Sequence, residues 1–143
     1  MGALNGSKNA LIGTMDISGS GVSGHGIRIG VKRGSNYTLA DLAGDWRMFG
    51  LNITGTCSYQ GWERAILVID SSGNITVGSG LLSDGTVPSF AHASLGTASI
   101  ASDGTVTTSD NVSFHGVLST DKTMLVVTVT DSRGGYGLMI CVK

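Results

Sequence analysis

Short runs of alternating apolar and polar residues recur along the chain, and they predict β-strands. Near the N-terminus, Ile27, Ile29 and Val31 alternate with charged residues and glycine, which is the period-two pattern of a sheet with one wet face. A strand is also expected at 9–15, and eight more follow at 45–52, 62–70, 75–82, 93–100, 105–109, 112–119, 123–130 and 136–142. Regularly spaced short strands without intervening helices predict an all-β barrel or sandwich. We expect one helical turn, at 38–44.

The connections between the predicted strands differ in length. Those at 71–74, 101–104 and 120–122 are short and polar, as in tight hairpin turns. The longer ones alternate with them, except for a short link near Asp110. In an up-and-down meander, alternate loops lie at opposite ends. We therefore predict an antiparallel up-and-down β-barrel of 8–10 strands, closed at one end by tight turns and open at the other.

The strand at 123–130 is apolar on both faces. Leu125, Val127 and Val129 lie on one face, and Met124 and Val126 on the other. A strand with one wet face does not have this pattern. We therefore expect either the N-terminal segment or another chain to cover it.

The two ends of the chain resemble each other. Residues 2–15 align with 116–129 at an offset of 114, and 26–32 align with 137–143 at an offset of 111. We interpret residues 1–32 as an N-terminal β-hairpin that copies 116–143, and 33–143 as the barrel domain. The segment 16–25 between the first two strands is predicted to be a flexible loop.

Three placements of this hairpin are open. It closes a preceding unit of a tandem array, it inserts between the first and last strands of its own barrel to give ten strands, or it docks on a neighbouring subunit. We favour insertion for the fold and keep subunit exchange, which would give a homo-oligomer, as an alternative.

The alternation in the first copy also predicts which residues point into the barrel. Transferred to the second copy, it predicts that Leu138, Ile140 and Val142 point inward. Met139 and Cys141 would then point outward, with Cys141 a lone thiol on the outer face.

Composition excludes several classes of function. The 143 residues suit one domain, and a charged fraction of 13% with a net charge of −1 argues against nucleic acid as a partner. Two cysteines and three separated histidines have no metal-ligand spacing, so we expect neither a metal nor a cofactor. Gly19, Gly21 and Gly24 have the spacing of a dinucleotide fingerprint, but a strand and not a helix follows them. No signal peptide or membrane span is evident, so we expect a soluble chain whose compartment is not determined.

Gly44-Asp45-Trp46, at the start of the first barrel strand, resembles the G-x-W signature of calycins, the group of lipocalins, fatty-acid-binding proteins and avidins. Thr130-Asp131 with Tyr136 resembles the T-D-x-x-Y pattern of lipocalins at a longer spacing. The resemblance implies an up-and-down barrel in which the Trp plugs the closed end and which holds a small, mostly apolar ligand. The lipocalin Arg that packs on this Trp has no evident counterpart before the last residue, Lys143.

The longer loops carry the candidate ligand-binding residues, because aromatic groups with a few polar groups are typical of a small-molecule site. These are Tyr59, Trp62, Phe90, His92, Arg133 and Tyr136. The alternative is that Trp62 and Phe90 only cap the core. His115 follows Phe114 in a predicted strand, so a core Phe114 would place His115 on the outer face.

These patterns predict a non-catalytic binding protein for a small hydrophobic or amphipathic ligand at the long-loop end of the barrel. The alternative is a structural or adhesive repeat module that associates through β-hairpins, without a small-molecule ligand. An enzyme is the third possibility, because Ser, His and Asp residues distant in sequence can still meet in space.

Overall fold

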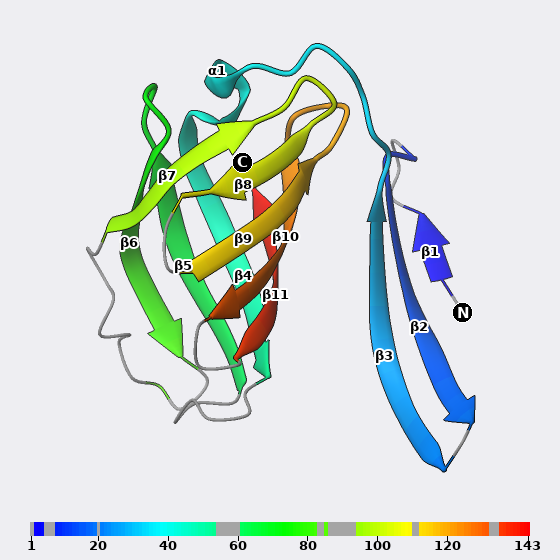
Figure 1. Ribbon diagram of the computed structural model, residues 1–143. Helices are drawn as coiled ribbons and strands as arrows, with labels where there is room; N and C mark the ends of the chain where they lie inside the picture. Colours follow the sequence, from blue (N-terminus) through cyan, green and yellow to red (C-terminus); the bar gives the residue numbers. More distant parts are fainter. Residues whose placement is uncertain are drawn as a thin grey trace.

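The computed structural model describes most of the chain, namely residues 2–4, 8–19, 21–53, 61–82, 85, 94–109, 112–131 and 135–143. It shows a closed antiparallel β-barrel of eight strands and a separate three-stranded sheet (Figure 1). The barrel strands are β4 (Gly44–Ile53), β5 (Gly61–Ile69), β6 (Asn74–Leu82), β7 (Ser94–Ile100), β8 (Thr105–Thr108), β9 (Val112–Leu118), β10 (Met124–Asp131) and β11 (Tyr136–Val142). The predicted all-β barrel is confirmed, and the predicted helical turn is α1 (Leu39–Leu42).

Each barrel strand pairs with its neighbours in the sequence, and β11 pairs with β4 to close the barrel. The closing register runs from Tyr136 opposite Ile53 to Val142 opposite Arg47. Insertion of the N-terminal hairpin at this point, which we had favoured, is therefore wrong. Both edges that the hairpin would need are already hydrogen-bonded to each other.

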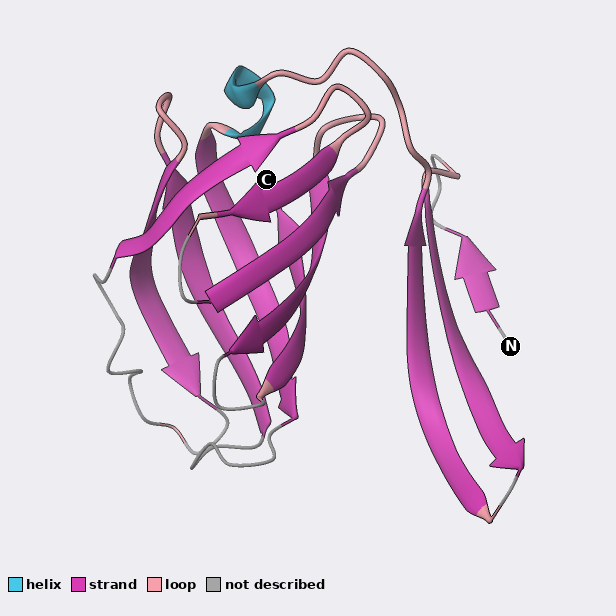
Figure 2. Ribbon diagram, viewed as in Figure 1, coloured by secondary structure: helices cyan, strands magenta, loops and turns pink. Residues whose placement is uncertain are grey.

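Tight turns gather at the barrel end that carries α1 (Figure 2). In one of them, Asp70 Oδ1 accepts hydrogen bonds from the backbone N–H groups of Ser72 (2.8 Å) and Asn74 (2.9 Å). This is the side-chain chemistry that makes Asp a frequent turn residue. Most residues of the three longer predicted loops lie outside the described part of the chain.

The N-terminal sheet consists of β1 (Gly2–Leu4), β2 (Ala10–Gly19) and β3 (Val22–Val31), in the order β1-β2-β3. The expected flexible loop at 16–25 is wrong, because both strands continue through it and a tight turn at Gly21 (φ 80°) joins them. Short residues such as Ser and Gly do not prevent strand pairing, although they weaken the strand signal in the sequence. Near the turn, His25 Nδ1 lies 2.6 Å from Asp16 Oδ1.

The closed end of the barrel is plugged by Trp46, which is fully buried. Its indole Nε1 donates a hydrogen bond to the Leu42 carbonyl oxygen (2.7 Å). Lys143 Nζ lies 4.7 Å from the centre of the Trp46 ring system and donates to the Asp41 carbonyl oxygen (2.8 Å). Lys143 therefore covers the Trp46 ring at this end of the barrel.

The predicted orientation of β11 is wrong. Met139 and Cys141 are buried inside the barrel, whereas Leu138, Ile140 and Val142 face outward and are half-buried. Both faces of β11 are apolar. The alternation of apolar and polar residues at 26–32 therefore does not show which face of β11 points inward. Cys141 is a free thiol as expected, but it lies inside, where burial raises its pKa to about 12. A thiol with this pKa stays protonated at neutral pH and is a poor nucleophile.

The predicted placement of Phe114 and His115 in β9 is confirmed, and in β10 the structure shows which of the two apolar faces points inward. Phe114 is buried, and His115 on the opposite face is exposed. Leu125 and Val127 are also buried, whereas Val126 faces outward and is half-buried. The outer wall of the barrel is therefore partly apolar here.

The base of the N-terminal sheet is attached to the closed end of the barrel. The Asn9 side chain hydrogen-bonds the Asp121 carboxylate. Arg33 Nη2 donates to the Asp103 carboxylate and to Thr105 Oγ1, the latter at 2.9 Å. These contacts join the turns of the barrel to both strands of the hairpin.

Asp121 predicts a decline of stability in acid. A short hydrogen bond from Ser119 Oγ (2.6 Å), with further bonds from Asn9 and Thr123, lowers the pKa of Asp121 from 3.8 to about 2. A carboxyl group whose pKa is lower in the folded state than in the unfolded state stabilises the fold at pH values above its unfolded-state pKa. This stabilisation is lost as the pH falls through the folded-state pKa. We expect thermal melts to show Asp121→Asn less stable than wild type at pH 7, with the gap closing between pH 3.8 and about 2. A gap that does not change with pH would contradict this role.

Candidate functional site

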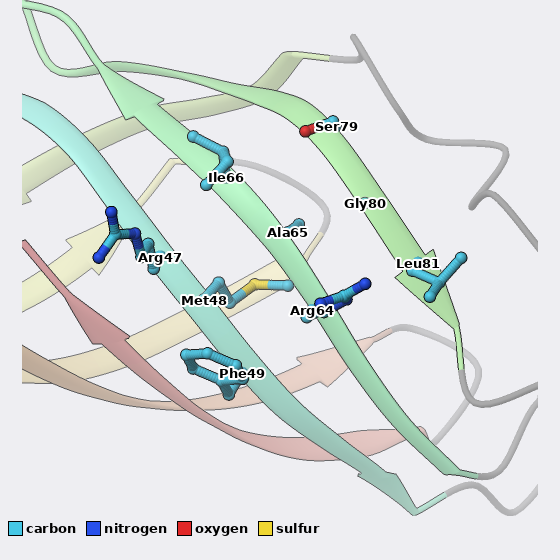
Figure 3. A pocket seen from close by; sticks show the side chains of 9 residues that line it. All are labelled: Arg47, Met48, Phe49, Arg64, Ala65, Ile66, Ser79, Gly80 and Leu81. Atoms are coloured by element: carbon cyan, nitrogen blue, oxygen red, sulfur yellow. The ribbon is translucent and has the colours of Figure 1, made fainter. Parts of the chain in front are cut away.

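A groove of about 380 Å³ lies on the outer wall of the barrel, across β4, β5 and β6 (Figure 3). Strand alternation makes six of its lining residues outward-facing, namely Arg47, Phe49, Arg64, Ile66, Ser79 and Leu81. Met48, Ala65 and Gly80 complete the lining. The groove thus combines two cations with apolar side chains.

A β-bulge shapes the β6 side of the groove. Ala65 pairs with Gly80 and Leu67 pairs with Val77, so β6 has one residue more than β5 between these pairs. The extra residue lies near Gly78, where a Cβ atom would meet the Ile66 carbonyl oxygen at 3.3 Å. Bulges bend a strand and interrupt its ladder. Together with the missing side chain of Gly78, this leaves room above β5.

The two arginines occupy diagonal positions on β4 and β5. Arg47 lies opposite Ile66, and Arg64 lies opposite Phe49. Diagonal positions of this kind are roughly 7–8 Å apart. Three ion pairs occur among the described residues, and neither arginine belongs to one of them. In Figure 3 the two side chains point away from each other, with Arg64 directed towards β6.

Two of the six sequence-predicted site residues are described, and both lie on the outer face. Trp62 is 46% exposed and Tyr136 is 56% exposed. They lie on either side of β4, where Leu51 pairs with both Trp62 and Leu138. Tyr59, Phe90, His92 and Arg133 lie outside the described residues. The role of these six residues in binding stays a prediction.

The chain's one glutamate, Glu63, is buried inside the barrel with 4% of its surface exposed. It lies opposite Gly50, where an added Cβ atom would come within 2.9 Å of Glu63 Oε1. Our sequence reasoning missed this position. The signal was present, because Glu63 continues the inward period of Ala65 and Leu67.

Sequence reasoning also missed the groove. Gly78 and Gly80 within a strand were a sign of a bulge, but its depth depends on how β6 pairs with β5. Among the described residues, no three His, Cys, Asp or Glu side chains are grouped closely enough to hold a metal ion. In the same part of the chain, no helix has the length and apolar character needed to cross a membrane.

Comparison with protein-family models gives no match, and comparison with curated proteins gives none either. Among solved structures, the chain is similar to a protein of unknown function from the DUF3598 family of Nostoc punctiforme PCC 73102. The TM-score is 0.44 at 13% sequence identity, and the match covers 100% of this chain and 65% of that chain. The chain thus spans less than two thirds of that protein's length.

Proposed function

We propose that this protein is a non-catalytic binding module for a small amphipathic anion, which it holds in the outer groove of β4–β6. The observation that carries the proposal is the pair Arg47 and Arg64, outside the ion pairs of the described residues, on an apolar groove of about 380 Å³. This volume lies within the roughly 300–1,000 Å³ of small-molecule sites.

The chemistry of the groove favours a carboxylate, sulfate or phosphate ester with a short hydrocarbon tail. A guanidinium group offers paired N–H donors that match such anions and is always charged. Phe49, Ile66 and Leu81 provide apolar surface for the tail, and burial of such a tail contributes about 0.8 kcal/mol per CH₂ group. The charge of the arginines selects an anionic head group, and the apolar residues supply most of the affinity.

The calycin resemblance supports a related but different site. A calycin-type barrel would hold its ligand inside, near the long loops. Trp46 at the closed end, covered by the Lys143 cation, fits that resemblance. The outer groove is our preferred site because its lining residues are described and carry the matching charge.

Calorimetric titration with octanoate tests the proposal, with 1-octanol as the uncharged ligand of equal chain length. We expect octanoate to bind and 1-octanol to bind more weakly. Arg64→Glu should weaken octanoate binding roughly tenfold or more, because it replaces a charge-assisted hydrogen bond with repulsion. Arg47→Glu should act in the same direction.

Arg28→Glu is the matched control, because it changes the net charge equally but lies on the N-terminal hairpin. Octanoate affinity should be unchanged in this variant. Equal binding of octanoate and 1-octanol, or equal loss in all three variants, would rule out a charge-selective site in the groove.

Association through the N-terminal hairpin is a second candidate function. The sheet β1–β3 is not part of the barrel, and it exposes Leu11, Ile12 and Ile27, each with 47–52% of its surface accessible. Exposed hairpins with large apolar residues favour association with another sheet or chain. Sedimentation equilibrium would test this candidate: a strictly monomeric chain at high concentration excludes it.

A further inference from the structure

The N-terminal sheet reproduces the pairing of β9, β10 and β11 register for register. Ala10 pairs with Val31, and residues 114 and 111 positions later, Met124 and Val142, pair in the barrel. The agreement extends to β1, because Gly2 pairs with Gly13 as Gly116 pairs with Val127, 114 positions later. Three strands with two shared registers indicate a duplicated unit, beyond a local sequence similarity.

The positions that face into the barrel differ strongly between the two copies. Val127 and Cys141, both buried, correspond to Gly13 and Gly30. The buried Met139 corresponds to Arg28. The N-terminal copy could not replace β9–β11 in a barrel, because it would leave cavities and bury an arginine.

Four of the positions that face outward are apolar in both copies. The matching pairs, barrel residue first, are Val126 and Ile12, Leu138 and Ile27, Ile140 and Ile29, and Val142 and Val31. In the barrel, these four residues are half-buried on the outer wall. In the hairpin, Ile12 is 49% and Ile27 is 52% exposed. What the copies share is therefore an apolar stripe that neither needs for the barrel interior.

We propose that the stripe of the hairpin, Ile12, Ile27, Ile29 and Val31, packs on the outer wall of β10–β11 in a second copy of this chain. This rests on the second candidate function and names its surface. The reciprocal contact would form at the same time, giving a two-fold symmetric dimer. The wall extends the apolar surface onto β4 and β5, where Leu51 (43% exposed) and Trp62 (46%) lie beside Leu138.

The area of the contact is limited by the wall, because β10 and β11 have 8 and 7 residues whereas β2 and β3 have 10 each. Two strands of the length of β10 and β11 form a face about 25 Å long and about 10 Å wide. Two hairpin faces and the two matching areas of wall bury roughly 1,000 Å² in total, which is about the minimum for a specific interface.

The charges of the two surfaces are compatible with this contact. The stripe face of the hairpin carries the Asp16–His25 pair near its tip, whereas Arg28 lies on the other face. The wall of β10–β11 presents Thr128 and Thr130 beside its apolar residues. Beside the wall, Arg47 on β4 lies opposite Val142, and His115 on β9 lies opposite Thr128.

Sedimentation equilibrium of full-length variants tests the surface. Ile27→Glu on the stripe and Leu138→Glu on the wall should each weaken dimerisation roughly tenfold or more, because each places a charge in an apolar contact. The double variant Ile27→Lys/Leu138→Glu should recover part of the loss. The matched controls are Leu11→Glu, on the opposite face of the hairpin, and Val68→Glu, on the outer face of β5 opposite Asp45. Both variants should dimerise normally.

A photo-crosslinking residue at position 27 gives a second measurement that does not depend on a folded Leu138→Glu variant. In a mixture of light and isotope-labelled chains, we expect intermolecular crosslinks to peptides of residues 124–142. If the crosslinks join hairpin to hairpin and Leu138→Glu leaves the dimer intact, the wall is not the docking surface. Association through the hairpin would still hold in that case. A monomeric wild type would overturn both.

Discussion

Replacement of Trp46 with alanine is expected to lower the free energy of unfolding by about 3–5 kcal/mol, the usual cost of truncating a large buried aromatic residue. Trp46 is fully buried at the closed end, and its Nε1–H satisfies the Leu42 carbonyl. Alanine would leave a cavity and an unpaired acceptor in the same place. Urea unfolding followed by circular dichroism would measure the loss.

Two milder variants separate the contributions at this end of the barrel. Trp46→Phe keeps most of the volume but loses the hydrogen bond, which contributes about 0.5–1.5 kcal/mol. Lys143→Met removes the cation over the ring and should cost about 0.5–1 kcal/mol. If Trp46→Ala were no more damaging than Lys143→Met, Trp46 would not be the plug of the barrel.

Replacement of Gly73 with alanine is the second large effect. Gly73 lies in the β5–β6 turn with φ 86°, and an added Cβ atom would lie 2.5 Å from the Ala98 carbonyl oxygen. The left-handed backbone costs a non-glycine residue about 1–2 kcal/mol, and overpacking adds about 1–3 kcal/mol. We expect a total loss of roughly 2–5 kcal/mol.

Gly85→Ala is the matched control for this variant. Gly85 has φ 84°, but no atom of the described residues lies within 4 Å of an added Cβ atom. It should therefore show the backbone cost alone. Chemical unfolding of both variants would measure the difference, and equal losses would mean that the close approach to Ala98 does not matter.

The barrel could be predicted from the sequence because strand alternation and turn residues are local signals. The prediction at 136–142 coincides with β11, and that at 75–82 differs from β6 by one residue. The inward face of β11 could not be predicted in the same way. It depends on pairing with β4 and β10, and with Leu138 and Met139 both apolar the sequence does not distinguish the two faces.

The candidate site was harder to predict than the fold. Arg47 and Arg64 are unremarkable in the sequence, and they become neighbours only through the β4–β5 register. The bulge near Gly78 makes room between the two arginines and Leu81. It depends on how β6 pairs with β5, which the sequence of one strand does not show. The aromatic residues of the long loops were predicted from composition and loop length, which do not fix where a side chain points.

The N-terminal hairpin shows the same limit at a larger scale. Its similarity to the C-terminal strands was visible in the sequence, and the same offsets relate the two registers. Its place relative to the barrel was not visible, because that depends on whether β11 and β4 leave an edge free. They leave none in the described barrel.

Titration of the isotope-labelled protein with octanoate, followed by the backbone amide signals, tests the central claim most directly. We predict that the shifts concentrate on β4, β5 and β6 around Arg47, Arg64 and Leu81, and that Arg64→Glu abolishes them. Shifts confined to residues that line the barrel interior, such as Glu63 and Met139, would contradict the outer groove and favour an interior site. The absence of any saturable shift would contradict the binding function itself.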